Sequence, residues 1–417
     1  MFPRPSAPGP LHLASGIRHP AFFALLLLAA SRAAAGPAED YLDAQLRVVK
    51  GLEGSVSTLV EAADLAATRL IGGGRLLLAG DRGIIAEVNG RAGGPCSTQV
   101  VSPGKTLVAK GDVVLFSESV PTDEAESAWM ALTVLFAPAE RPDRPQWQLK
   151  ANVRPVLVDI GPDACLLKLP SGERCVSKAA PALAIAEWAF VAELIGACRR
   201  QGKQLAIYLS IHLDEGRKRF ERTRGLMFEP GLKPEPVPAG QFAKAFLGHV
   251  RTSLEGMRRD DGAAIRKAAA WLREAKAAGR KTVRHLYGHM PPHEVGSPGD
   301  PPIFTDTVTG PVGGQGAEWV QKNLHEGDAY LLIGYQQNEE AMAAAASAVG
   351  ARSIFMTSLP PGAEQAKDPL HLYVNPHWPV TDGCLELPGY DVKACPLSAI
   401  MGLACYYAIC AEAIAAP

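Results

Sequence analysis

The chain has 417 residues, of which 47% are hydrophobic and 20% are charged, and its formal net charge is −1. A chain of this length can form two cores of ordinary size. So balanced a charge argues against a nucleic-acid-binding protein. The composition therefore indicates an ordinary globular protein.

The first 35 residues differ from the rest of the chain. Basic residues precede the apolar run Ala21–Ala30, and Ala33–Ala35 supplies small residues where a signal peptidase would cut. We interpret residues 1–35 as a signal peptide, which predicts a periplasmic or secreted protein. The alternative is a mis-assigned start codon upstream of a cytoplasmic enzyme. The run is shorter than the ~20 residues that cross a bilayer, and we expect no stable membrane span in the mature chain.

Eight cysteines are scattered along the chain without a CxxC motif or a Cys/His pair at metal-ligand spacing. Cys405 and Cys410 lie inside an apolar helical pattern. We therefore expect the cysteines to be small core residues, a usage that fits poorly with an oxidising compartment. We predict no cofactor.

After the predicted signal peptide, apolar residues at helical spacing predict one or two helices over Ala38–Leu70. Arg75–Ala79 then reads as a buried strand that leads into a helix from Ile84. The loop between them has two charged residues between two glycines: Gly80, Asp81, Arg82 and Gly83. A strand that enters a helix through such a loop points free N–H groups at a ligand above the sheet, usually an anion.

A second strand, Val113–Phe116, is followed by the hydroxyl residues Ser117, Ser119 and Thr122. Hydroxyls at the end of a strand and the start of a helix can hold a phosphate together with backbone N–H groups. We predict a helix over the apolar stretch Ala125–Phe136, which has helical length.

Three further elements complete the first half of the chain. Strands are predicted over Pro155–Ile160 and Cys165–Leu169, and a long helix over Ala179–Arg199. Strands that alternate with helices at this spacing imply a parallel sheet with helices on both faces.

Residues 201–241 do not fit this pattern, and we interpret them as a Pro-rich linker that packs on the surface. The pattern then restarts with helices over Phe242–Met257 and Gly262–Ala278 and a strand over Thr282–Tyr287. A second unit of the same kind therefore begins near residue 242.

The two halves contain similar segments in the same order. Gly74-Arg75 corresponds to Gly279-Arg280, Glu87-Val88 to Glu294-Val295, Gly111–Val113 to Gly327–Ala329, Pro155–Ile160 to Ser353–Thr357, and CLLKLP (Cys165–Pro170) to CLELP (Cys384–Pro388). We therefore predict a tandem duplication, with domains at 36–200 and 242–417. Ser117, Ser119 and Thr122 are replaced by Ile333, Tyr335 and Asn338 in the second copy, so one anion pocket has been lost or changed.

The strand, loop and helix order and the Ser-x-Ser-x-x-Thr run resemble the SIS (sugar isomerase) domain, a flavodoxin-like phosphosugar-binding module. Arg91–Gly94 is similar to the RAGG sequence at the same junction of small bacterial SIS proteins, whereas Val120 stands where the family has glycine. The resemblance implies two three-layer α/β/α units with parallel sheets, packed through their helices as a pseudo-dimer. It also implies a site built from both units and permits a homodimer.

Four residues are candidates for proton transfer, which aldose–ketose isomerisation requires. Glu87 lies where SIS isomerases such as phosphoheptose isomerase place a carboxylate, although an ion pair with Arg91 four residues later is an equal reading. His289, His293 and Glu294 gather in a Gly/Pro loop after a strand. They are catalytic, or a metal site with Asp300 or Asp306, or a loop hydrogen-bonded for structural reasons.

The sequence therefore predicts a protein that binds a phosphosugar and has aldose–ketose isomerase-like chemistry. The alternative is a non-catalytic module for a sugar or sugar phosphate, and an exported protein could bind a non-phosphorylated sugar. The binding residues predicted are Gly80, Asp81, Arg82, Gly83, Arg91, Ser117, Ser119 and Thr122. A plain turn with a solvated Asp81 and Arg82 pair is the other reading of the first loop.

Overall fold

The computed structural model describes residues 36–102, 104–117, 130–140, 151–211, 213–335 and 339–415. Residues from Pro37 onward form one compact unit. The predicted signal peptide lies outside the described residues, so export stays a prediction. Ser119, Val120 and Thr122 also lie outside them.

The first sheet contains five parallel strands in the order β2-β1-β3-β4-β5. The strands are β1 (Leu76–Gly80), β2 (Thr98–Val100), β3 (Val113–Ser117), β4 (Leu132–Pro138) and β5 (Val153–Val158). The chain order reverses between β1 and β3, which are neighbours although β2 lies between them in sequence. This is the flavodoxin-like arrangement, in which ligands bind beyond the carboxyl ends of the strands at that switch point.

The second sheet repeats this order as β9-β8-β10-β11-β12, again with parallel strands. Its strands are β8 (Thr282–Leu286), β9 (Asp306–Val308), β10 (Ala329–Ile333), β11 (Arg352–Met356) and β12 (His371–Tyr373). The predicted fold class, two flavodoxin-like α/β units in tandem, is thereby confirmed.

The helix predicted over Ala125–Phe136 is wrong where the structure describes it. Leu132–Pro138 is strand β4, all seven residues of which are buried between β3 and β5. A central strand of a parallel sheet is covered on both faces, so its sequence is continuously apolar. Together with the residues before it, the apolar run of β4 is long enough to be mistaken for a buried helix.

This error also shifted one match of the repeat. Ser353–Thr357 overlaps β11, which follows β10 in the second sheet as β4 follows β3 in the first. Pro155–Ile160 overlaps β5, whose counterpart is β12. The pairing of these two segments was therefore wrong by one strand, whereas the glycine-led matches before β1 and β3 agree with the strand order.

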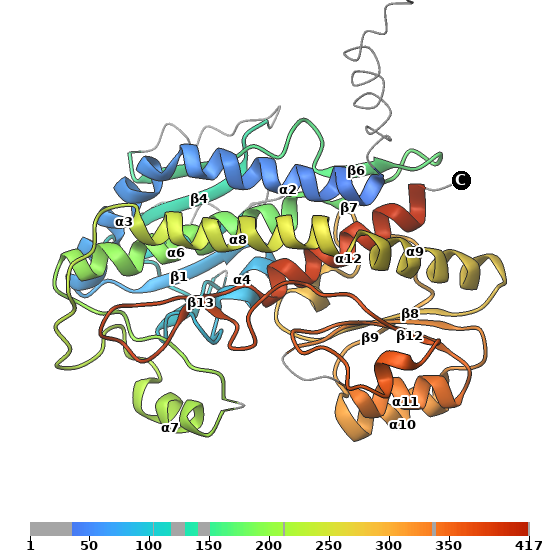
Figure 1. The fold of residues 1–417 in the computed structure, drawn as a ribbon. Helices are drawn as coiled ribbons and strands as arrows, with labels where there is room; N and C mark the ends of the chain where they lie inside the picture. Colours follow the sequence, from blue (N-terminus) through green and yellow to red (C-terminus); the bar gives the residue numbers. More distant parts are fainter. Residues whose placement is uncertain are drawn as a thin grey trace, which may run out of the picture. The chain divides into compact units, whose positions relative to one another are not determined.

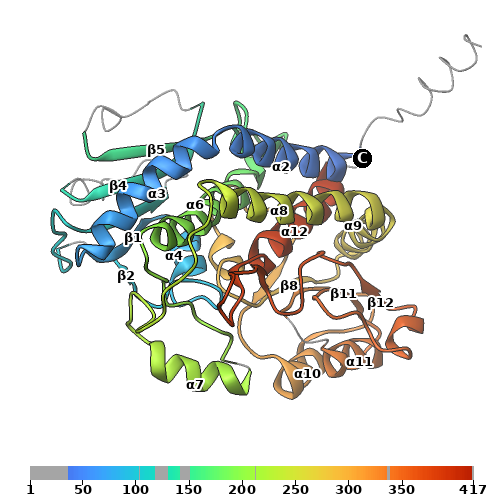
Figure 2. The same cartoon turned by 60° about the vertical axis from the view of Figure 1, so that its left-hand side comes forward.

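Helices of both halves pack together between the two sheets (Figures 1 and 2). They are α2 (Pro37–Gly54), α3 (Val56–Ile71), α6 (Ala179–Arg200), α8 (Gln241–Asp260), α9 (Gly262–Ala277) and α12 (Ser398–Ala415). Their buried side chains form one continuous core with residues of both sheets. Helices α10 (Gly313–Asn323) and α11 (Glu340–Ala348) cover the opposite face of the second sheet (Figure 1).

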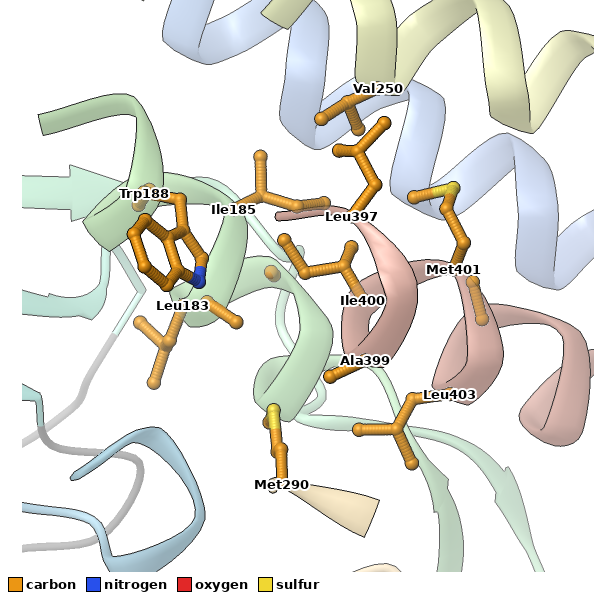
Figure 3. Close-up of a cluster of buried hydrophobic side chains, with 14 of the residues drawn as sticks. Leu183, Ile185, Trp188, Val250, Met290, Leu397, Ala399, Ile400, Met401 and Leu403 are labelled. Atoms are coloured by element: carbon orange, nitrogen blue, oxygen red, sulfur yellow. The ribbon is translucent and has the colours of Figure 1, made fainter. Parts of the chain in front are cut away.

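Helices α6 and α12 are long and apolar enough to cross a membrane. In this structure, 100% and 83% of their most apolar stretches are buried inside the protein, as in the core helices of a globular protein. Figure 3 shows Ile185 of α6 beside Ile400 of α12 in this core. All eight cysteines are buried and free, as the sequence predicted.

Each half ends with a two-stranded antiparallel hairpin and its long apolar helix. The hairpins are β6 (Cys165–Lys168) with β7 (Arg174–Ser177), and β13 (Gly383–Leu385) with β14 (Ala394–Pro396). The similar sequences CLLKLP and CLELP therefore occupy the same structural position. Val176 and Cys395, each three residues before the helix, both have left-handed backbones, with φ of 66° and 59°.

The hairpins exchange contacts between the halves. The Val176 N–H donates to Gly299 O of the second half, and the Cys395 N–H donates to Gly93 O of the first half. Gly93 and Gly299 lie equally far along the chain from the first residues of β1 and β8. The two units therefore join through reciprocal contacts, as in a two-fold symmetric dimer.

The 201–241 segment is more than a surface linker. Leu205, Ala206 and Ile207 are fully buried, and Tyr208 exchanges backbone hydrogen bonds with Gly93 and Gly94. Helix α7 (Asp214–Thr223) follows. The segment thus adds an arm to the edge of the first unit, and the domain boundaries at 200 and 241 stay a prediction.

Candidate functional site

A cavity of about 500 Å³ lies beyond the carboxyl ends of β8 and β10. Tyr287 and His289 follow β8 in the chain, and Tyr335 follows β10, so the cavity is at the switch point of the second sheet. The first unit adds the loop after α4 (Arg82–Val88), and the arm adds its strand-like part and Phe220 of α7. The described lining residues are Gly90, Arg91, Ala92, Tyr208, Leu209, Ser210, Ile211, Phe220, Leu286, Tyr287, Gly288, His289, Pro292, Thr309, Gly310 and Tyr335.

Arg91 is the predicted binding residue that the structure brings to this cavity from the first unit. Its side chain is 2% exposed, and its Nη2 donates to Asp382 Oδ2 at 2.8 Å and to Ser398 Oγ. The Nε lies 3.4 Å from Glu87 Oε1. Two nearby carboxylates hold the pKa of Arg91 far above its usual range, although burial acts in the opposite direction. Arg91 is therefore a permanent cation fixed between two acids.

Glu87, the predicted base, does not line the cavity. It is fully buried behind Arg91, and burial raises its pKa to about 7 against the lowering effect of Arg91. The ion pair with Arg91 that the sequence offered as an alternative is present, at 3.4 Å, although Arg91 lies beyond the end of α4. Glu87 is therefore paired with Arg91 of the cavity wall and does not itself reach the cavity.

Asp382 organises the second unit's side of this cluster. It is 1% exposed, and its Oδ1 accepts hydrogen bonds from the N–H groups of Leu397 and Ser398 at the start of α12. Its Oδ2 accepts from Tyr335 Oη at 2.6 Å and from Arg91. One carboxylate thus caps a helix and links Arg91 to a residue at the end of β10.

His289 is the other predicted residue that reaches the cavity. Its Nδ1 lies 3.1 Å from the carbonyl oxygen of Ala86, which can only accept, so Nδ1 carries the proton. Burial, together with the charge of Arg91, lowers the pKa of His289 to about 4. The ring is therefore neutral at pH 7, and Nε2 is its unprotonated nitrogen. Its neighbour Met290 is buried in the core and anchors the loop (Figure 3).

The other two residues of the predicted histidine cluster point elsewhere. His293 is exposed and is not part of the lining. Glu294 is buried against α4, accepts a hydrogen bond from Tyr407 Oη at 2.7 Å, and has its pKa raised to about 7 by burial. Among the described residues, no three His, Cys, Asp or Glu side chains converge as metal ligands.

The predicted anion loop is folded onto its own side chains. The Asp81 carboxylate accepts from the N–H groups of Gly83 and Ile84, at 2.9 and 3.4 Å. Arg82 is exposed. Gly80 has φ of 97°, and a Cβ there would lie 2.0 Å from Ser117 O, so this strand end requires glycine. None of these four residues lines the cavity.

Ser117 is turned into the core. Its hydroxyl donates to Glu187 Oε2 of α6 at 2.5 Å, and both residues are buried. Burial raises the pKa of Glu187 to about 8, and the nearby Asp81 and Glu87 add to the rise. Ser117 therefore has a partner inside the protein, and the remaining hydroxyls of the predicted clamp lie outside the described residues.

Sequence reasoning missed Asp382 and the contributions of Tyr208, Ser210 and Phe220 from the arm. The repeat contained one usable signal: Tyr335 occupies the position that corresponds to Ser119, immediately beyond the third strand. For Asp382 and the arm we find no comparable signal, because they approach the cavity only through tertiary contacts.

These features define an α/β protein with two flavodoxin-like units and a cavity at a switch point. No protein-family model matches the chain, and no curated protein matches its sequence. Solved structures do resemble it, at very low sequence identity.

A protein from Silicibacter pomeroyi DSS-3, provisionally named a phosphosugar isomerase, is 10% identical, with 91% of this chain and 97% of that chain covered and a TM-score of 0.44. A protein from Salmonella typhimurium LT2, provisionally named a sugar-binding protein, is 10% identical. The match covers 90% of this chain and 98% of that chain, with a TM-score of 0.45. A third protein, from Clostridium difficile 630 and provisionally named a phosphosugar isomerase, is 8% identical. The match covers 90% of this chain and 92% of that chain, with a TM-score of 0.47. The fold class rests on the strand orders of the two sheets.

Proposed function

We propose that this chain binds a sugar or a sugar derivative, phosphorylated or not, in the cavity beyond β8 and β10. The observation that carries the proposal is the lining itself. It combines hydroxyl groups, a neutral imidazole and a guanidinium with aromatic and aliphatic side chains at a switch point. A concave, partly apolar site with a few fixed polar groups is typical of small-molecule binding, and this mixture suits a ligand with many hydroxyls and apolar C–H faces.

Calorimetric titration of the protein tests the proposal, with D-glucose, D-fructose, N-acetyl-D-glucosamine and the 6-phosphate of each. We expect at least one of these compounds to bind. The variant Ala92→Trp, which fills the cavity from the loop after α4, should lose that binding. Ala278→Trp is the matched control, because Ala278 is exposed at the end of α9 and contributes nothing to the lining.

Loss of binding in both variants, or in neither, would place the ligand elsewhere and refute the proposed site. If none of the six compounds binds the unmodified protein, the proposed function itself is refuted.

Isomerase-like chemistry is the second candidate, and one observation favours it. The Nδ1 of His289 is held by Ala86 O, and its unprotonated Nε2 belongs to a side chain of the lining, which places it to accept a proton from a carbon next to a carbonyl group. Glu87 would then tune the charge beside Arg91 without touching the ligand.

Proton exchange gives the test of this chemistry. In D₂O, an isomerase incorporates deuterium at C2 of the aldose that binds, which proton NMR detects. The exchange should disappear in His289→Gln and persist in His293→Gln, whose side chain is exposed. Binding without any exchange would leave a non-catalytic binding protein.

A further inference from the structure

The charge of the cavity wall bears on two classes of ligand, a free sugar and its phosphate ester. Arg91 is the single formally charged side chain among the described residues of the lining. Its Nη2 is 2.8 Å from Asp382 Oδ2, and its Nε is 3.4 Å from Glu87 Oε1. A phosphate that approached Arg91 would meet a cation that already has a carboxylate at hydrogen-bond distance.

Helix N-termini are the other groups with which a parallel α/β fold binds anions. Helix α10 begins just after Thr309 and Gly310 of the lining, and Glu339 Oε2 accepts the Gly313 N–H at 2.7 Å. Helix α12 begins beside Arg91, and Asp382 Oδ1 accepts the Ser398 N–H at 2.9 Å. Carboxylates of the protein therefore hold the positions that a ligand anion would take.

The same holds at the first sheet, where Asp81 accepts the N–H groups at the start of α4. The N-termini of α4, α10 and α12 thus each carry an acidic side chain of the chain itself. An incoming phosphate would have to displace these carboxylates or remain close to them, and like charges at such distances repel strongly in a partly buried site.

The remaining polar groups of the lining are uncharged. Tyr287, Ser210 and Thr309 have hydroxyls that can both donate and accept, which matches the hydroxyls of a sugar, whereas the Tyr208 hydroxyl donates to Cys96 O at 3.0 Å. Tyr208 stacks on Phe220 with ring centroids 5.5 Å apart, so the arm presents an aromatic surface to the cavity. Aromatic rings offer large apolar area with a polar tip, which suits the C–H face of a sugar ring.

We infer that this cavity selects an uncharged sugar over the corresponding phosphate ester. The inference rests on the proposed function, that a saccharide binds here. A phosphate ester would bring nearly two negative charges next to Glu87 and Asp382, and it would lose its hydration without gaining an unmatched cation. The free sugar loses only neutral hydrogen bonds to water, which the lining can replace.

The three sugar and sugar-phosphate pairs used above test the preference directly on the unmodified protein. In each pair that binds, the free sugar should have a Kd at least about tenfold lower than its 6-phosphate, a difference of about 1.4 kcal/mol. Its Kd should also change less than about twofold between low and high salt, because no net charge is paired on binding. A phosphate ester that binds more tightly than its free sugar overturns the inference and leaves the proposed function standing.

The variant Asp382→Asn tests the physical cause. It keeps the shape of the cluster and removes one of the two carboxylates that neutralise the charge of Arg91. The affinity for the phosphate ester should therefore rise about tenfold relative to that for the free sugar. Asp391→Asn removes the same charge from an exposed partner of Arg219, outside the lining, and should change neither affinity. If Asp382→Asn folds and the ratio of the two affinities does not change, the carboxylates are not the cause of the preference. If that variant does not fold, the sugar and sugar-phosphate pairs measured on the unmodified protein still decide the preference.

Discussion

At the switch point of the second sheet, Arg91 and His289 line a cavity, whereas at that of the first sheet Ser117 and Glu187 are bonded to each other inside the core. The two places have the same strand order and follow strands of equal length. What differs is the residue set that the opposite unit supplies. The first unit sends Arg91 into the second unit's cluster, while the second unit sends Glu294 against α4.

The two units thus share a strand order and differ in the side chains that lie beyond their strand ends. The reciprocal contacts at Gly93 and Gly299 keep the units in register, and the cores beneath them are continuous. Side chains beyond the strand ends are not needed for that register. The buried Ser117–Glu187 pair lies beyond the strand ends of the first sheet, and the cavity with Arg91 and His289 lies beyond those of the second.

The largest expected effect comes from removing the buried guanidinium of Arg91 at the cavity of the second sheet. Arg91→Met leaves Glu87 and Asp382 buried without their shared partner, and loss of one member of a buried ionic cluster costs about 3–5 kcal/mol. Urea unfolding at pH 8 should show this loss of unfolding free energy. The loss should become smaller toward pH 5, because Glu87 is protonated there.

Arg82→Met is the control for that experiment, because Arg82 is exposed and should be replaceable within about 0.5 kcal/mol. Equal destabilisation by the two variants, or no pH dependence for Arg91→Met, would contradict the burial of an uncompensated acid.

The next effect tests the strand end of the first sheet. Gly80→Ala places a Cβ 2.0 Å from Ser117 O at a left-handed backbone position and should cost about 2–4 kcal/mol. The last residue of β8, Leu286, has no such constraint. Thermal unfolding measures the change. Gly51→Ala, in an exposed part of α2 with open space around it, should instead stabilise by about 0.5–1 kcal/mol.

A pH profile of stability tests the buried Ser117–Glu187 pair of the first unit. The folded pKa of Glu187 is raised from 4.5 to about 8, so the folded protein holds a proton that the unfolded chain releases. Its contribution to stability is present below pH 4.5 and is lost as the pH rises through 8. Each unit of pKa shift corresponds to about 1.4 kcal/mol of unfolding free energy. Because the buried site relaxes around the charge, we expect the total loss of unfolding free energy to be only about 2 kcal/mol.

Glu187→Gln keeps an oxygen that accepts from Ser117 and cannot ionise. This variant should match the unmodified protein at pH 5 and exceed its unfolding free energy at pH 9. Glu173→Gln, at an exposed site, serves as the comparison and should leave the profile unchanged. A variant that is less stable at pH 9 would show that the Glu187 carboxylate is stabilising.

The smallest effect concerns the cap of α4. Asp81→Ala removes the acceptor of the Gly83 and Ile84 N–H groups and should cost about 1 kcal/mol in chemical unfolding. Asp81→Asn retains the side-chain oxygen and should cost only a few tenths. If the two variants behave alike, the carboxylate charge and not the capping oxygen determines the effect.

The sequence by itself determined most of the frame. Apolar runs located β1, β3, β8 and the long helix α6, and the pair CLLKLP and CLELP identified equivalent hairpins. Local pattern is sufficient for such elements because propensity and periodicity act over short distances. It failed for β4, where burial on both faces removes the alternation that distinguishes a strand from a helix.

Only the tertiary structure decided which candidates share a site. Arg91 and His289 meet at one cavity because the loops after α4 and β8 approach each other across the two units. Glu87, equally plausible in sequence, is covered by Arg91, and His293, four residues from His289, is exposed. Asp382 joins the cluster from 291 residues beyond Arg91. Contacts over such separations depend on the packing of whole units, which no local pattern encodes.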